Sequence, residues 1–162
     1  MVLFLSLAVM TTAYFITASG QDIQERMIYS VPIIVLHAAW SIYLAAMTDW
    51  GNMFLCGFWI VHLIIYILLN KFQIWGGGDS DLFLLSADLC LASGPVVSTY
   101  TIAVRECLCL AAGLALAVGI GYVEAEVKGE KLKGSREMAV VPGMAVVMTA
   151  LIMKGFVWRL MQ

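Results

Sequence analysis

A run of three glycines leads directly into an aspartate in the stretch Gly76-Gly77-Gly78-Asp79. A long apolar run precedes the glycines and an apolar segment follows the aspartate, so we expect Asp79 at or just inside a membrane boundary. Non-helical backbone at that depth is tolerated only where protein or a water-filled cavity surrounds it. An ionisable residue in such a position is a functional candidate, which makes Asp79 the first candidate catalytic residue.

The glycines before Asp79 favour a backbone with unusual freedom. Without a Cβ atom they permit positive φ and allow another chain to lie close against them. A carboxylate beside such a backbone suits an aspartyl peptidase, because an extended substrate must pass the catalytic group closely. A simpler interpretation is that the glycines form a flexible loop and that Asp79 only caps the next helix.

An aspartyl peptidase needs a second carboxylate, close enough to share a proton with the first, and such proximity raises one of the two pKa values. Asp22 follows the first apolar run and is the candidate partner of Asp79. Taken alone, Asp22 could also be a solvated loop acid beside Arg26.

Three further charged residues are possible secondary members of the site. Asp81 and Asp88 follow Asp79 closely in the sequence. Asp88 lies about two and a half helical turns beyond Asp79. It could act as a relay, or as a structural partner of Arg105 within the fifth apolar run.

The composition predicts an integral membrane protein with one domain over residues 1–162. The chain is 62% hydrophobic and only 12% charged, whereas soluble domains carry roughly a quarter charged residues. The lipid bilayer is therefore an expected partner. A net charge of −2 gives no indication of nucleic-acid binding. The four cysteines form no Cys-x-x-Cys pair and no His-Glu-x-x-His motif occurs, so we expect neither a metal nor another cofactor.

Apolar runs predict an all-α fold of six transmembrane helices, with a glycine-rich loop at residues 71–78 leading into a short fourth helix. A span needs roughly 17–25 residues. The predicted helices cover residues 2–19, 29–47, 53–69, 81–92, 96–122 and 139–158. We expect the first run to be a retained helix and not a signal peptide, because no positively charged segment precedes it.

The basic residues predict the orientation, since cytoplasmic loops are enriched in lysine and arginine. The chain has nine basic residues, and six follow the first, third and fifth predicted spans: Arg26, Lys71, Lys128, Lys131, Lys133 and Arg136. We therefore expect the N-terminus outside and these loops at the cytoplasmic face. Asp22 and Asp79 then lie on the same side, while Asp49 lies on the other.

The stretch Gly76-Gly77-Gly78-Asp79, followed by an apolar helix, resembles the G-x-G-D motif of type IV prepilin peptidases and archaeal preflagellin peptidases. These enzymes are intramembrane aspartyl proteases. Asp22, with a polar stretch containing Arg26 after it, resembles the first motif of that family. Pro142-Gly143 resembles the start of its last helix. The resemblance extends over nearly the whole chain in the order of the predicted helices.

The resemblance implies that Asp22 and Asp79 are the catalytic pair and that Gly76, Gly77 and Gly78 shape the loop. It implies hydrolysis of a prepilin-like precursor, whose short basic leader is removed at the cytoplasmic face of the cell membrane. It implies no metal.

The chain departs from the family at two points. Asp81 stands where the family usually has lysine, and its charge could raise the pKa of a neighbour or attract a basic leader. Bifunctional members also carry a methyltransferase region with paired Cys-x-x-Cys motifs, so we expect peptidase activity without N-methylation.

A non-enzymatic interpretation stays open: a small transporter or membrane-assembly subunit whose boundary acids carry protons or ions. We interpret His37 and His62 as core residues and not as ligands. Small residues in the fifth predicted span, Gly113 and Ala117 among them, indicate close helix packing. The sequence leaves the oligomeric state open.

Overall fold

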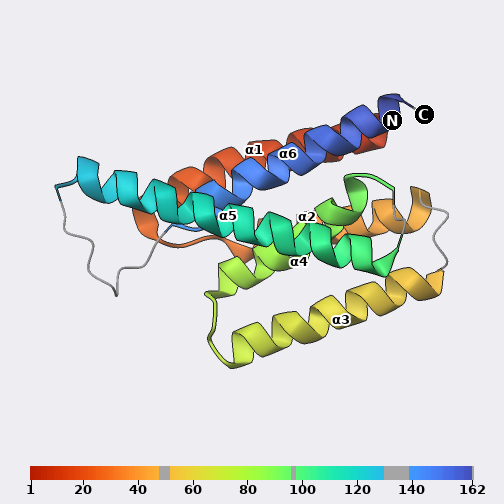
Figure 1. The fold of residues 1–162 in the computed structure, drawn as a ribbon, viewed down its shortest axis with the longest axis horizontal. Helices are drawn as coiled ribbons and strands as arrows, with labels where there is room; N and C mark the ends of the chain where they lie inside the picture. Colours follow the sequence, from red (N-terminus) through yellow and green to blue (C-terminus); the bar gives the residue numbers. More distant parts are fainter. Residues whose placement is uncertain (48–51, 96–97, 130–138, 162) are drawn as a thin grey trace.

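The protein is an all-α membrane protein. The structure, a computed structural model, describes residues 1–47, 52–95, 98–129 and 139–161. In this part of the chain six helices and no strand occur (Figure 1). The helices are α1 (Val2–Glu25), α2 (Ser30–Met47), α3 (Asn52–Lys71), α4 (Gly77–Ala92), α5 (Thr99–Val127) and α6 (Val141–Leu160).

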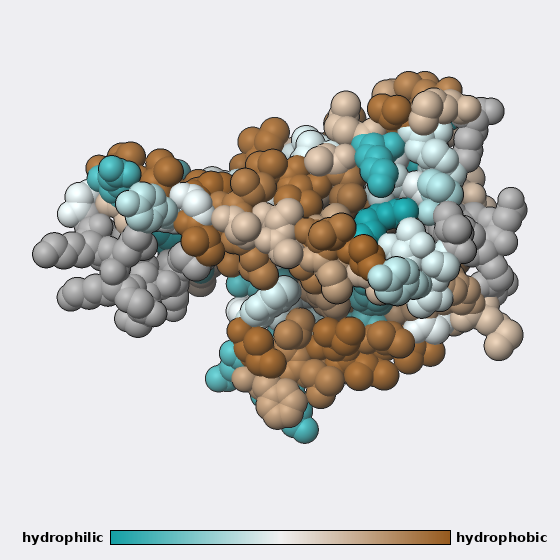
Figure 2. Space-filling view, in the orientation of Figure 1, coloured by the Kyte–Doolittle hydropathy of each residue, from teal (hydrophilic) through white to brown (hydrophobic). Residues whose placement is uncertain are grey.

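Five of the helices, all except α4, are long and apolar enough to cross a membrane. Helix α4 has 16 residues, which gives a length of about 24 Å against a hydrocarbon core of roughly 30 Å. Large apolar side chains face outward from the bundle, for example Ile60, Ile64 and Ile67 on α3. Figure 2 shows such side chains over much of the visible surface, as expected of a surface in contact with lipid.

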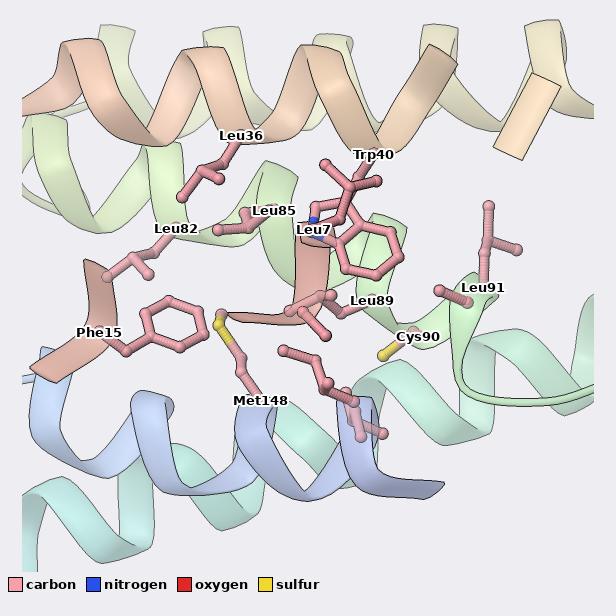
Figure 3. Packing of buried hydrophobic residues seen from close by; sticks show 14 of the residues in the cluster. Leu7, Phe15, Leu36, Trp40, Leu82, Leu85, Leu89, Cys90, Leu91 and Met148 are labelled. Atoms are coloured by element: carbon pink, nitrogen blue, oxygen red, sulfur yellow. The ribbon is translucent and has the colours of Figure 1, made fainter. Parts of the chain in front are cut away.

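Helix α4 is the centre of the bundle. It packs against α2, α3, α5 and α6, and every residue from Ser80 to Ala92 is buried. Its apolar residues are not confined to one face, which is typical of a helix surrounded by protein. Figure 3 shows Leu85 and Leu89 of α4 among Trp40 of α2, Phe15 of α1 and Met148 of α6.

The C-terminal end of α4 is closed by two arginines. Arg105 of α5 donates hydrogen bonds to the carbonyls of Cys90 (2.8 Å) and Pro95 (3.2 Å). Arg159 of α6 donates to the carbonyl of Ala92 (2.7 Å). The last carbonyls of a helix have no partner within the helix and carry partial negative charge. The two guanidinium groups satisfy the carbonyls of Cys90 and Ala92, so this short helix can end inside the bundle.

The small residues predicted to allow close packing in the fifth span do so at two positions. A Cβ atom added to Gly143 of α6 would lie 2.4 Å from the amide nitrogen of Ala117 and 2.4 Å from the carbonyl oxygen of Gly113 on α5. The backbones of α5 and α6 therefore touch at this crossing. Gly119, by contrast, has nothing within 4 Å of an added Cβ.

Several predicted boundaries differ from the observed ones. Helix α1 continues to Glu25, six residues beyond its predicted end, and α5 continues to Val127. Both extensions are polar, whereas the predicted helix ends were placed where the apolar runs stop. Asp49 and the basic loop residues Lys131, Lys133 and Arg136 lie outside the described residues.

Candidate active site

Asp22 lies in the last turn of α1 and is only 5% exposed. The interpretation as a solvated loop acid is therefore wrong, because α1 continues past Asp22 and turns it inward. Its Oδ2 atom accepts a hydrogen bond of 2.9 Å from the amide of Val141, the first residue of α6. The first amides of a helix have no partner within the helix. Asp22 thus closes the N-terminal end of α6 with a side chain from a distant segment.

Asp79 lies in the first turn of α4, whose N-cap is Gly76. An acid is favourable in this position because of the partial positive charge at a helix N-terminus. Asp79 is half-buried. Burial, together with the charge of Asp22, raises the pKa of Asp79 from 3.8 to about 6. Asp79 therefore retains its proton at a pH where an ordinary aspartate is ionised.

Asp22 and Asp79 line one cavity of about 470 Å³ at the end of the bundle where α1 ends and α4 begins. Arg26, Met27 and Ile28 line the same cavity, as do residues 76–78. The two candidate catalytic acids are thus brought together from α1 and α4, and a cationic side chain lies beside them.

The glycines are placed differently from the prediction. Gly77 and Gly78 belong to the first turn of α4, so the predicted loop at 71–78 is two residues too long at this end. The helix begins here because the amide of Ser80 donates to the carbonyl of Gly76 (3.0 Å). None of the three glycines has positive φ.

Close approach is the property of glycine that this site uses. A Cβ atom on Gly78 would lie 2.8 Å from the Cβ atom of Ile28, which follows α1. A Cβ atom on Gly76 would lie 3.4 Å from Oδ2 of Asp79, and one on Gly77 would meet nothing within 4 Å. Gly78 therefore lets the segment after α1 lie directly against the start of α4, which brings the two aspartates to one cavity.

The possible secondary residues lie outside this cavity. Asp81 is 2% exposed and forms a side-chain hydrogen bond with Tyr66 of α3. A buried acid in that position is not available to attract a basic leader. The charge of Asp81 does act electrostatically on neighbouring groups, namely Tyr14 and Tyr66. It is not among the groups that raise the pKa of Asp79, which are burial and Asp22. Asp81 instead ties α4 to α3.

Asp88 is fully buried, and its partners do not include Arg105, the partner considered from the sequence. It accepts hydrogen bonds from Ser41 (3.1 Å) and Trp59 (3.0 Å), and it pairs with Nδ1 of His37 at 2.6 Å. The considered pairing of Asp88 with Arg105 is wrong, because Arg105 is engaged by the carbonyls at the end of α4.

The sequence position of Arg26 does not indicate that this residue belongs to the site. It pairs with Glu124 of α5 at 2.7 Å, and Glu124 also binds Lys128 at 2.6 Å. The partners Arg26 and Glu124 are 98 positions apart, so no local pattern could have indicated the pair. The ion pair ties the segment after α1 to the C-terminal part of α5 and holds a guanidinium at the cavity.

The chain matches no family model, and no curated protein and no solved structure matches it at the significance expected of a relative.

The arrangement places two carboxylates that interact electrostatically at one cavity, as acid–base hydrolysis by a pair of acids requires. The pKa of Asp79, raised to about 6, makes it a candidate proton donor. Asp22 accepts backbone hydrogen bonds from Val141 and Val140, and it lines the cavity in which it could act on a water molecule. Repulsion between two close carboxylates favours the state with one shared proton.

Proposed function

We propose that this protein is an intramembrane aspartyl endopeptidase with Asp22 and Asp79 as its catalytic pair. The observation that carries the proposal is that these two acids, one in the last turn of α1 and one directly after a glycine run in the first turn of α4, line a single cavity at one end of the bundle. The raised pKa of Asp79, caused by burial and by Asp22, supports its role as the group that supplies a proton.

In the proposed reaction Asp22 starts as the base and Asp79 as the acid. A water molecule gives a proton to Asp22 while its oxygen attacks the carbonyl carbon of the scissile peptide. Asp79 gives its proton to the carbonyl oxygen, which produces a neutral tetrahedral intermediate. Collapse of the intermediate breaks the C–N bond; the proton on Asp22 passes to the leaving nitrogen, and Asp79 regains a proton from a hydroxyl group. The measurable pKa values belong to the pair.

The proposed substrates are prepilin-like precursors with a short basic leader and an apolar helix. The support is the resemblance of the two aspartate motifs and the order of the helices. In this proposal all six helices lie in the cell membrane, the short α4 included, with Asp22 and Asp79 at the membrane boundary. The N-terminus is outside and the cavity opens at the cytoplasmic face, where most basic residues are expected.

The deciding experiment is co-expression with a prepilin-like precursor, read as a mobility shift and as the new N-terminus. The wild type should cut after the last residue of the leader, and Asp79→Asn and Asp22→Asn should not. An asparagine side chain can still accept the bond from the Val141 amide, so Asp22→Asn removes the carboxylate and keeps the cap. Cleavage by either variant would remove that residue from the mechanism. If the inserted wild type cuts none of a panel of precursors, the peptidase proposal fails and the transporter or assembly interpretation takes its place.

A further inference from the structure

A second pair of ionisable side chains lies away from the catalytic cavity, between α3 and α5. His62 of α3 is 6% exposed, and its Nε2 atom lies 3.2 Å from both carboxylate oxygens of Glu106 on α5. The pair lies at the edge of a cavity of about 540 Å³, which is otherwise lined mainly by apolar side chains such as Phe54, Val61 and Ile102. The proposed peptidase reaction uses neither residue.

The hydrogen bonds of His62 determine where its protons are. Its Nδ1 atom lies 2.8 Å from the carbonyl oxygen of Phe58. A carbonyl can only accept, so Nδ1 must carry a proton. The other nitrogen, Nε2, faces Glu106, and a hydrogen bond there also needs a proton. Either Nε2 carries it, which makes an imidazolium beside a carboxylate, or Glu106 carries it and donates to Nε2. Both arrangements hold one proton more than a neutral imidazole beside an ionised carboxylate.

The surroundings of the pair favour this additional proton. Without it the pair would carry a net negative charge inside the helical bundle, where an uncompensated charge is costly. Asp88 of α4, which is paired with Nδ1 of His37, also acts electrostatically on His62. The neighbouring cation, Arg105, binds the carbonyls at the end of α4. The aromatic rings of Phe58 and Phe83 lie against the imidazole of His62, with their ring centroids 4.0 and 5.4 Å from its centroid. These rings supply no charge.

We propose that His62 and Glu106 form a buried proton-binding site that fastens α3 to α5. Figure 1 shows α3 along one edge of the bundle, and α4 is the helix against which α3 packs extensively in the described chain. The His62–Glu106 pair adds a direct connection from α3 to α5. The ligand is a single proton taken from water, and its loss leaves a net charge between the two helices.

The chain contains two histidines, which makes the test direct. The wild type is labelled with 15N in histidine and 13C in the glutamate carboxyl groups, reconstituted in bilayers, and examined by solid-state NMR at pH 7. The His37→Gln variant leaves His62 as the sole histidine, and Glu106→Gln assigns the carboxyl signal. The expected result is an additional proton on the pair: an imidazolium beside a carboxylate, or a neutral His62 beside a protonated Glu106. A neutral His62 beside an ionised Glu106 would overturn the proposal.

The Glu106→Gln variant is the second arm of the experiment. Glutamine can still hydrogen-bond to Nε2 but cannot bind the additional proton. We expect His62 in this variant to be neutral at pH 7 and to keep its proton on Nδ1, because the Phe58 carbonyl is unchanged. An imidazolium signal that persists in Glu106→Gln would show that the pair does not hold the proton. The wild-type spectrum decides the proposal by itself if this variant fails to fold.

Discussion

The carboxylate of Asp22 accepts a hydrogen bond of 2.9 Å from the amide of Val141, 119 positions further along the chain. The residue proposed as a catalytic base therefore also caps the N-terminal end of α6. A capping acid and a catalytic acid have different requirements, since a cap needs only an oxygen acceptor and catalysis needs an ionisable carboxylate. Substitutions at Asp22 can separate the two.

Asp22→Ala should destabilise the protein, and Asp22→Asn should destabilise it less. Removal of a side-chain cap costs about 1–2 kcal/mol, and here it also leaves the buried Val141 amide without its partner. The measurement is thermal unfolding of both variants in the same detergent. Equal melting temperatures for Asp22→Ala and the wild type would show that the bond contributes nothing to stability, whereas both variants should be inactive as peptidases.

Asp79 makes stability depend on pH in a specific direction. Its pKa rises from 3.8 to about 6 in the folded protein, so the folded state binds the proton more tightly than the unfolded chain does. The contribution of Asp79 to stability is therefore complete at low pH. It is lost as the pH rises from about 4 to about 6, because ionisation is then more costly in the folded state.

The Asp79→Asn variant cannot ionise and should lack that loss. We expect it to unfold at a higher temperature than the wild type at pH 8, and the difference should shrink as the pH approaches 4. The check is the difference between the two melting temperatures across this range, which cancels the titration of groups that do not interact with Asp79. A difference independent of pH would contradict the raised pKa of Asp79.

The sequence was sufficient to predict an all-α membrane protein, and to predict that Asp22 and Asp79 lie at the same end of it, because these features depend on local signals. Apolar runs indicate helices whatever those helices pack against. The glycine run before Asp79 can be recognised from the four residues Gly76-Gly77-Gly78-Asp79 alone. The cap on Val141 and the pairing of Arg26 with Glu124 were not predictable, since partners so far apart leave no periodic pattern. His37 and Asp88 are 51 positions apart, and the same reason applies to them.

The start of α4 could not be predicted for a different reason. Glycine has low helix propensity, roughly 1 kcal/mol below alanine, so three glycines indicate a loop. The helix nevertheless includes Gly77 and Gly78. The contact with Ile28 leaves no room for a side chain on Gly78, so packing requires glycine there although glycine disfavours the helix. Tertiary packing here overrides local preference.

Gly78→Ala should disrupt the cavity, and Gly77→Ala is its matched control. The Cβ atom on Gly78 would lie 2.8 Å from Ile28, whereas the one on Gly77 would meet nothing. Overpacking of this kind costs about 1–3 kcal/mol, and the displaced segment carries Asp79. We expect Gly78→Ala to lower precursor cleavage at least ~10-fold, since a misplacement of about 1 Å can cost more than that. Gly77→Ala should retain near-wild-type cleavage.

A second-site change tests whether the clash with Ile28 is the cause. Ile28→Ala removes the atoms beyond Cβ, of which two lie within 3.3 Å of the added methyl group. The double variant Gly78→Ala/Ile28→Ala should therefore recover part of the cleavage lost in Gly78→Ala. Cleavage that stays at the level of Gly78→Ala would point to the backbone of α4 and not to this contact.

The crossing of α5 and α6 should be the least tolerant of added volume. Gly143→Ala places a methyl group 2.4 Å from backbone atoms of both Gly113 and Ala117, and backbone cannot move aside as a side chain can. We expect a loss of at least about 2 kcal/mol, at the upper end of overpacking effects. Gly119→Ala on α5 is the control, because its added methyl group meets no atom within 4 Å. Thermal unfolding in detergent should show a lower melting temperature for Gly143→Ala alone.

Because Asp22 binds the amide of Val141 two residues earlier, cleavage should fall in the same variant. Unchanged stability and cleavage would mean that the two helices can separate at this crossing without affecting the site.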